Sequence, residues 1–303
     1  MKTPSNLTPH TVPRTGELLA LSLSLLLALP TAHAGFFKKI AAVAAVGAVA
    51  HAYAGHQRKD HAGQHSSAGQ APTGGSSCAS QLPQGKTPTF ANPKLGVDVH
   101  MICYQEYAVA VSGKTLTALW SAEYLTRQRL TAAKSVKRVN SFHEEDSLPA
   151  ASRSHLRDWV RSGYDRGHLS PSGDASTSRA QNETFSLANM VPQNPSNNRH
   201  LWEGIESGTR AFALSNGKLY VITGPLFVGQ NIKFINNRVA VPTQLFKLLY
   251  NPVNNTAGVY VVDNIDTKTI AWKSIPEFEQ SSSYRFGLGS PALMGMPQPK
   301  QHF

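Results

Sequence analysis

The sequence has few cysteines and few acidic residues. Its 303 residues include two cysteines, and 18 Asp and Glu residues stand against 29 Lys and Arg. With no CxxC motif and no further cysteine, a cysteine-based metal site is disfavoured. Only 16% of the residues are charged and 41% are hydrophobic, so most of the chain is expected to be globular. The net charge of +11 favours anionic partners but does not identify them.

Long apolar runs are scarce outside the N-terminus. There, Lys2 and Arg14 precede an apolar stretch at residues 18–30, and the sequence Ala32-His33-Ala34 follows it. The stretch is too short to cross a bilayer comfortably, and A-x-A is typical of a signal-peptide cleavage site. We therefore predict that residues 1–34 are a signal peptide, with an uncleaved anchor as the alternative. The expected location is periplasmic or secreted, with no stable membrane span after processing.

Export also bears on the two cysteines, Cys78 and Cys103. They lie close in sequence, in a chain expected to reach an oxidising compartment. We interpret them as one structural disulfide that holds the N-terminal edge of a folded domain. Two free thiols or a metal-binding pair are the alternatives.

The chain divides by composition into an N-terminal region, a folded domain and a tail. After the signal peptide, residues 35–77 form an Ala-rich segment and a flexible linker rich in His, Gly and Ser. Residues 78–290 have the pattern of a folded domain, and residues 291–303 are expected to be loosely ordered. Strand patterns at 106–111, 116–124, 219–223 and 257–262, with a helix-like stretch within 196–214, predict an α+β fold. The central sheet should be mostly antiparallel and flanked by helices.

Two segments carry residues suited to phosphodiester chemistry. The first contains Asp165-Arg166-Gly167-His168, and the second runs from Asn189 through Pro192, Gln193, Asn198 and Trp202 to Glu206. Together they resemble the DNA/RNA non-specific endonuclease family, the ββα-metal nucleases with the DRGH motif, similar to secreted bacterial nucleases and mitochondrial endonuclease G. The gap of 30 residues from His168 to Asn198 is also the one this family uses. The resemblance implies the ββα-metal nuclease fold.

His168 is the expected general base. The unperturbed histidine pKa of about 6.5 leaves much of the imidazole neutral near pH 7, so it can accept a proton from water. Gly167 directly before it is expected to let backbone and substrate approach closely. The alternative is a histidine packed for structural reasons, which the complete motif disfavours.

Asn198 and Glu206 are the residues expected to act with a metal ion. The resemblance implies that Asn198 is the metal ligand, and an amide oxygen suits a hard cation such as Mg²⁺, with Mn²⁺ as a substitute. Glu206 lies eight residues later, close to two helical turns, and the family uses a glutamate there to orient metal-bound water. A helix N-cap is the alternative for Asn198, and a solvated carboxylate is the alternative for Glu206.

Arg166 and Lys114 are the expected substrate-binding cations. Arg166 is also expected to act in catalysis, by supporting the transition state, although an ion pair with Asp165 is an alternative. The family often has a phosphate-binding arginine shortly before the tryptophan matched by Trp120, and here only Lys114 is present. A run without acids provides either a phosphate-tracking patch or a solvated face: Arg127, Arg129, Lys134, Lys137 and Arg138.

These observations predict an exported, sugar-non-specific endonuclease. It should hydrolyse DNA and RNA with Mg²⁺ and leave 5′-phosphate ends. The alternatives are a non-catalytic nucleic-acid-binding protein and a phosphodiesterase acting on another anionic substrate. An inhibitor or immunity protein is a further expected kind of partner.

Overall fold

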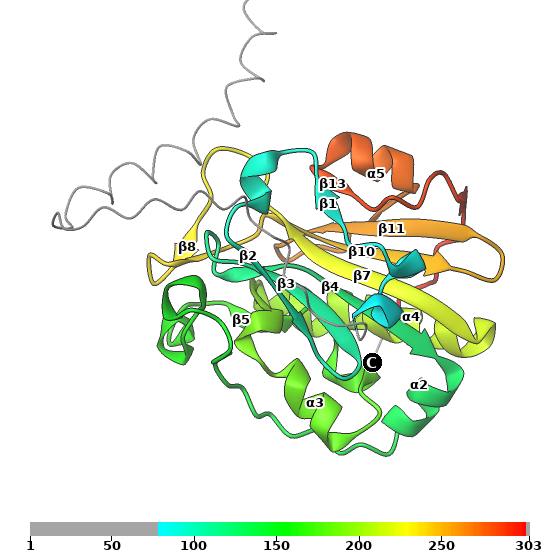
Figure 1. Ribbon diagram of the computed structural model, residues 1–303, viewed down its shortest axis with the longest axis horizontal. Coiled ribbons are helices and arrows are strands. Elements are labelled where there is room, and N and C mark those ends of the chain that lie inside the picture. The colour runs from blue at the N-terminus through cyan, green and yellow to red at the C-terminus, as the bar shows by residue number, and fades with distance from the viewer. Residues whose placement is uncertain (1–77, 301–303) are drawn as a thin grey trace, which may run out of the picture. The chain divides into compact units, whose positions relative to one another are not determined.

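The computed structural model describes residues 78–300, which contain a mixed α and β domain (Figure 1). Its main sheet has eight strands, ordered β12-β11-β10-β7-β4-β3-β2, with β14 beside β11. Every pairing is antiparallel except that of β14 with β11. The predicted α+β fold with a mostly antiparallel central sheet is confirmed. The strands are β2 (Val99–Cys103), β3 (Tyr107–Ser112), β4 (Thr117–Thr126), β7 (Lys218–Leu226), β10 (Gln244–Asn251), β11 (Thr256–Asp263), β12 (Ala271–Lys273) and β14 (Ala292–Leu293).

The sheet is buried on both faces because helices and connecting segments cover each side (Figure 1). In β3, Tyr107 and Val109 point into one apolar cluster and Ala108 and Ala110 into the other, as the alternation of a strand requires. One face packs against α4 (Glu203–Asn216), and the other packs against α5 (Ile275–Ser281). Apolar packing on both faces therefore holds the sheet in place, and the shorter elements are attached to it.

Shorter elements surround the sheet. Helices α2 (Arg127–Ala133) and α3 (Ser178–Thr184) begin after Thr126 and Thr177, whose side chains accept backbone hydrogen bonds and so cap them. Three two-stranded antiparallel sheets complete the strands: β1 (Thr89–Phe90) with β13 (Tyr284–Arg285), β5 (Asp165–His168) with β6 (Met190–Gln193), and β8 (Phe234–Ile235) with β9 (Val239–Ala240). Single 3₁₀ turns lie at Ala79–Gln81, Pro83–Gly85, Pro93–Gly96, Ala150–Ser152, Leu156–Trp159, Ser172–Asp174 and Leu187–Asn189.

Residues 291–300 pack against the domain, in contrast to the expected loosely ordered tail. The Trp272 indole N–H donates to the Met294 carbonyl at 3.0 Å, and the Lys300 amide donates to the Gly204 carbonyl at 2.9 Å. Gly204 and Gly208 leave room for this segment on α4, because a Cβ at either position would collide with its backbone. The pattern of the tail is too short and too rich in proline to reveal this docking, which depends on two glycines about 90 residues away.

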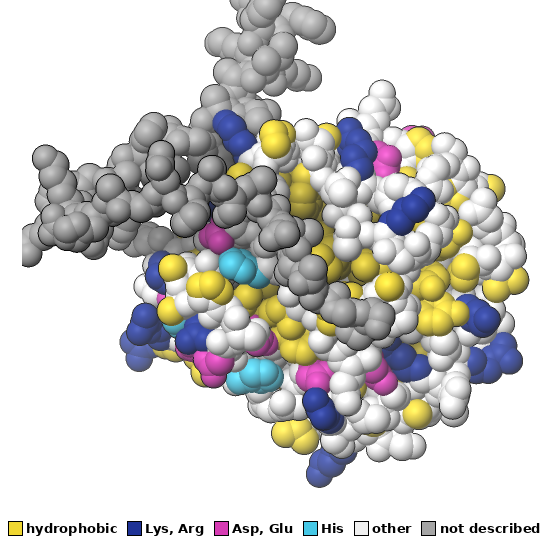
Figure 2. Space-filling model, in the orientation of Figure 1, with side chains coloured by type: hydrophobic (Ala, Val, Ile, Leu, Met, Phe, Trp, Pro, Cys, Tyr) yellow, Lys and Arg dark blue, Asp and Glu magenta, His cyan; other side chains and the backbone are white. Residues whose placement is uncertain are grey.

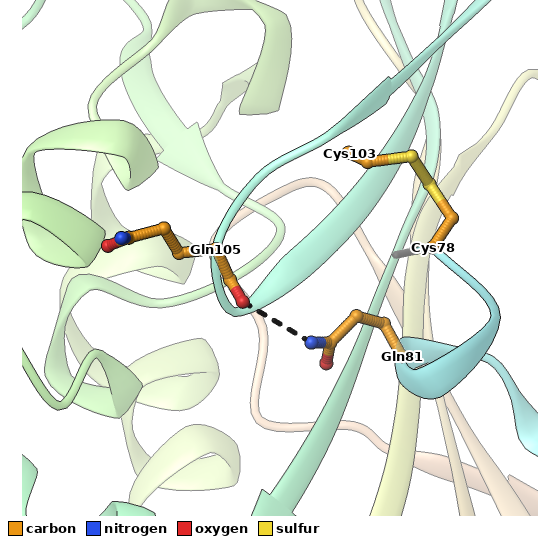
Figure 3. The surroundings of a disulfide bond; sticks show 4 residues. All are labelled: Cys78, Gln81, Cys103 and Gln105. Carbon is orange, nitrogen blue, oxygen red and sulfur yellow. Dashed lines mark hydrogen bonds between the residues drawn. A yellow bond between two sulfur atoms is a disulfide. The ribbon is translucent and has the colours of Figure 1, made fainter. Parts of the chain in front are cut away.

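Cys78 and Cys103 form a disulfide, as the sequence predicts (Figure 3). The bond joins the start of the described chain to the end of β2 across 25 residues of sequence. Beside it, the Gln81 side chain donates to the Gln105 carbonyl at 3.5 Å. The N-terminal edge of the domain is therefore covalently held against the sheet.

The expected signal peptide and linker lie outside the described residues. No helix among residues 78–300 has the length and apolar character needed to cross a membrane.

Loss of this disulfide should destabilise the domain. Closing a loop of this length restricts the unfolded chain and stabilises the fold by about 3 kcal/mol. We expect the Cys78→Ser/Cys103→Ser variant to lose about 2–4 kcal/mol of unfolding free energy in urea titrations. Wild-type protein with reductant is the matched comparison.

Intact-mass analysis after thiol alkylation should find no free thiol in the mature chain, which is expected to start at Gly35. Two alkylated thiols would contradict the predicted disulfide.

Candidate active site

A cavity of about 810 Å³ opens where the β5–β6 hairpin meets the N-terminal end of α4. The hairpin provides the DRGH sequence as β5, and the helix follows β6 after a short connection. The motif residues are therefore carried by the two paired strands and by the helical segment that follows them. The charged and polar residues of its lining are Arg138, Asn140, Tyr164, Asp165, Arg166, His168, Ser172, Asn198, Arg199, Glu203, Glu206 and Arg210.

His168 lies at the end of β5, with its ring packed between aromatic side chains. Its ring centroid is 4.9 Å from that of Phe185, edge to face, and 5.8 Å from that of Phe142. Burial, together with the nearby positive charges of Arg138 and Arg166, lowers the pKa of His168 to about 3. The imidazole is therefore neutral near pH 7. Its buried Nε2 atom has no hydrogen-bond partner within residues 78–300, which leaves it available to a molecule in the cavity.

Asn189 holds the backbone that follows His168. Its side-chain nitrogen donates to the Ser170 and Thr184 carbonyls at 2.9 Å each, and its oxygen accepts from the Ser170 amide at 3.0 Å. The Leu169 amide also donates to the Asn189 carbonyl at 3.0 Å. The buried amide side chain makes three of these four bonds, which tie the segment after β5 to the segment before β6. Asn189 therefore holds the backbone beside the cavity and does not line it.

Packing between β5 and β6 requires a glycine at position 167. A Cβ at this position would collide with the side chain of Gln193, which pairs with Asp165 on the neighbouring strand. Gln193 is fully buried and donates to the Asn197 side-chain oxygen at 2.8 Å. The glycine is therefore required by packing between β5 and β6.

Asn198 faces the cavity with its amide held in one orientation. Its side-chain nitrogen donates to Asp165 Oδ2 at 3.0 Å, and Arg199 forms two hydrogen bonds to the same carboxylate at 2.8 and 2.7 Å. Partial burial opposes ionisation, but the bonds from Arg199 and Asn198 lower the pKa of Asp165. An ionised carboxylate accepts only, so it must face the NH₂ group of Asn198, which leaves the amide oxygen for the other side. Asp165 therefore pairs with Arg199 and not with Arg166.

The segment between Asn198 and Glu206 begins with a π-helical turn at Asn197–Trp202, which then continues into α4. Asn198 lies inside this turn, and its side chain makes no N-cap bond. Such turns are rare and often occur at functional sites. Asn198 and Glu206 line the same cavity, although the path between them is not the regular α-helix expected from their spacing. Trp202 is 1% exposed and belongs to the core, as expected.

Glu206 lies among buried charges. Burial raises the pKa of Glu206 to about 7, against the opposing effect of Lys247 and Arg210 and with a further raising effect from Asp174. Lys247 extends from β10, is 1% exposed and donates to Thr223 Oγ1 at 2.7 Å. Arg210 forms a salt bridge to Asp174 at 3.0 Å. The carboxyl can therefore change its protonation state near neutral pH.

The cationic residues of the cavity are only partly those expected. The Arg166 guanidinium lies 4.0 Å from the centroid of the Phe142 ring and lines the cavity. Lys114 is exposed in the β3–β4 turn and is not part of the lining. Arg138 lines the cavity and comes from the basic run expected to provide either a phosphate-tracking patch or a solvated face, whereas Arg210 was not singled out. Arg210 could have been found, because it follows Glu206 by one helical turn.

The basic run from Arg127 to Arg138 does not form one surface. Arg129 is paired with Glu123 at 3.1 Å and with Glu106 at 3.3 Å. Arg127 donates to the carbonyls of Leu214 and Ser215 near the end of α4, where a cation is favourable. Arg138 alone lines the cavity, where it donates to the side chains of Asn140 and Ser172 at 2.9 Å. Two of the five residues therefore have structural roles.

The donor atoms at the cavity fit a hard divalent cation. The Asn198 amide oxygen and the carboxyl groups of Glu203 and Glu206 are all oxygen donors, which Mg²⁺ prefers over nitrogen and sulfur. Residues 78–300 contain no group of three or more His, Cys, Asp or Glu arranged to hold a metal.

The raised pKa of Glu206 predicts a stability effect that depends on pH. A carboxyl whose pKa is raised on folding binds more protons in the folded state, so unfolding free energy falls as pH rises from about 4.5 to about 7. Glutamine mimics the neutral form, so we expect metal-free Glu206→Gln to melt at a higher temperature than wild type at pH 8. The two should melt alike at pH 4. Equal melting temperatures at both pH values would show that folding does not raise the pKa of Glu206.

Comparison with known proteins places this site in a wider group. The profile of the DNA/RNA non-specific endonucleases matches residues 86–290. Nuclease C1 of Cunninghamella echinulata var. echinulata is 36% identical over 182 residues, covering 54% of this chain and 72% of that protein. A nuclease of Nostoc sp. is 34% identical over 232 residues, covering 67% and 77%. Human mitochondrial endonuclease G is 35% identical over 156 residues, covering 48% of this chain and 52% of that protein.

A solved structure supports the same grouping. The crystal structure of an EndoG/EndoGI complex, which concerns the mechanism of EndoG inhibition, matches with a TM-score of 0.54 and 27% sequence identity. The match covers 62% of this chain and 85% of the other. The fold is therefore that of the ββα-metal nucleases. The chain belongs to the DNA/RNA non-specific endonuclease family.

Proposed function

We propose that the protein is an exported, sugar-non-specific endonuclease that hydrolyses DNA and RNA with Mg²⁺ and leaves 5′-phosphate ends. One observation carries the proposal. A neutral imidazole with an unpartnered nitrogen, an amide oxygen and a carboxyl line one cavity, together with four arginines. The family is generally dependent on a divalent metal, and the disulfide between Cys78 and Cys103 is consistent with export.

In this proposal His168 is the general base. Its neutral Nε2 accepts a proton from a water molecule, whose oxygen forms a bond to phosphorus as the bond from phosphorus to the 3′ oxygen breaks. Arg166 and Arg138 line the cavity with His168 and bind the phosphate, so Arg138 supplies the contact that Lys114 was expected to make. The aromatic packing of the imidazole fixes its position during proton transfer.

Asn198 and Glu206 act on the other side of the phosphate. The Asn198 amide oxygen would hold Mg²⁺, which when bound supplies positive charge to offset that of the phosphoryl oxygens and of the leaving 3′ oxygen. Glu206, once deprotonated, accepts hydrogen bonds from water in the cavity and so orients it. Contacts to phosphate carry no information about base sequence, so cleavage should have low selectivity.

Digestion of DNA and RNA by the purified mature chain tests the proposal. With added Mg²⁺ both substrates should be cut, EDTA should stop the reaction, and the new ends should carry 5′-phosphate. Small-molecule and lipid phosphodiesters form a second set of substrates. Nucleic-acid binding without cleavage would favour a non-catalytic binder. Turnover of only the small phosphodiesters would favour another phosphodiesterase.

A further inference from the structure

The loop at residues 156–161, here called the 156–161 loop, forms one wall of the cavity. Trp159 and Val160 line the cavity, and Tyr164 lines it where the chain continues toward β5. The other side of this loop is exposed and basic: Arg157 and Arg161 both face solvent. Neither guanidinium has a salt bridge or a side-chain hydrogen bond within the described part of the chain. On the left of the described surface in Figure 2, where Figure 1 labels β5 and β8, Lys and Arg side chains lie among acidic and histidine side chains.

Contacts of buried residues fix the 156–161 loop to the domain, and this holds its exposed residues in place. Asp158 is 1% exposed, and its carboxylate accepts from the His155 amide at 2.9 Å and from Asn236 at 2.9 Å. It also forms a salt bridge to Arg238 at 3.3 Å. Trp159 is buried in an apolar cluster. The two central residues of the loop therefore fix it to the domain, while the residues around them remain at the surface.

The exposed residues come together through the local backbone. Leu156–Trp159 is a 3₁₀ turn, in which residues three apart lie on one side, and Val160 follows it directly. Val160 is 69% exposed although it borders the cavity. Arg161 has a φ of 53°, a left-handed conformation that is uncommon for residues other than glycine. Exposed Arg157 and Arg161 therefore lie within three residues of Val160, which borders the cavity.

This arrangement has the chemistry of a surface for a polyanionic strand. Unpaired guanidinium groups match phosphate oxygens, and an exposed valine between them can pack on a sugar. We propose that the exposed side of the 156–161 loop binds the nucleic-acid strand beyond the scissile phosphate, with Arg157 and Arg161 each contacting a phosphate. This proposal rests on the proposed function, because it assigns the path of the substrate of that same cavity.

The Arg157→Ala/Arg161→Ala variant tests the proposal. Each phosphate contact contributes about 0.7 to the slope of log K against log salt on single-stranded DNA and about 0.9 on a duplex. Binding of the metal-free protein in EDTA to a single-stranded 20-mer should therefore lose about 1.4 of that slope. With Mg²⁺, KM for the same oligonucleotide should rise by about tenfold with unchanged kcat, and turnover of a dinucleotide should not change.

The matched control is Lys94→Ala/Lys218→Ala. It removes the same charge from two exposed residues that do not line the cavity. Its salt slope and kinetics should equal those of wild type, and melting temperatures should show that both variants are folded. Val160→Asp, which places a negative charge at the cavity mouth, should raise KM for the oligonucleotide, while Val160→Thr, which keeps the branched shape of the side chain, should not.

Three results would overturn the proposal. An unchanged salt slope in the arginine variant would show that the loop does not contact the strand. Equal losses in both double variants would show a general effect of charge. A fall in kcat on the dinucleotide would place the arginines in catalysis instead. If wild type binds DNA with a strong salt dependence but never cleaves it, the proposed function fails, and the slope comparison still decides the role of the loop.

Discussion

His168→Ala should cut the rate on both DNA and RNA by about 10²–10⁴-fold, the range typical of losing a positioned proton acceptor. Because burial lowers the pKa of His168 to about 3, the imidazole is neutral at working pH and contributes no charge to phosphate binding. Substrate affinity should therefore hardly change. The measurements are turnover, DNA affinity and melting temperature on the same preparation.

A structural role for His168 predicts a different outcome. The ring packs on Phe185 and Phe142, so a histidine kept only for packing would lose stability, and activity would fall with the folded fraction. His200, an exposed residue of the π-helical turn outside the cavity lining, offers a control, and His200→Ala should retain near wild-type activity. A stable, DNA-binding His168→Ala protein that cleaves at near wild-type rate would reject the mechanism.

Asn198→Ala should raise the magnesium concentration needed for half-maximal activity by about tenfold or more. In the proposed mechanism the Asn198 amide oxygen would hold the ion, so its removal should weaken magnesium binding. A second readout needs no turnover: the rise in melting temperature on adding Mg²⁺ should be large in wild type and small in the variant.

Asn216→Ala is the matched control for this prediction. Asn216 ends α4, is exposed, and bonds only to the Phe212 carbonyl of its own helix. Its magnesium midpoint should equal that of wild type. If Asn198→Ala keeps both the midpoint and the plateau of the magnesium titration, the metal ligand lies elsewhere.

Local pattern was sufficient for β3, β4, β7 and β11, for the disulfide and for which motif residues to examine, but β2 and β10 of the main sheet were not predicted. Strands β3 and β4 are visible in sequence because alternating or continuous apolar residues are bounded by turn residues. The spacing of Asn198, Glu206 and Arg210 is also local, because residues near one helix face recur at a fixed interval. The catalytic and metal-binding roles of these residues remain predictions.

Contacts between distant segments were not predictable in this way. Gly167 is explained by Gln193, which pairs with β5 from the other strand of the hairpin, and Gly204 and Gly208 are explained by the C-terminal segment. The expected loose tail was wrong for residues 291–300 for the same reason. A glycine shows in sequence only that space is needed, and the folded chain shows which neighbour occupies it.

By itself, the sequence determined the family, the mixed α and β class and the motif residues, because each depends on short-range pattern or on spacing along one element. Only the tertiary structure decided which cations reach the cavity. Arg138 reaches it, Lys114 does not, and Arg129 is used in ion pairs with Glu123 and Glu106. The physical reason is that a charge acts through its distance to other groups. Folding sets that distance by packing segments far apart in the chain, and no local pattern records it.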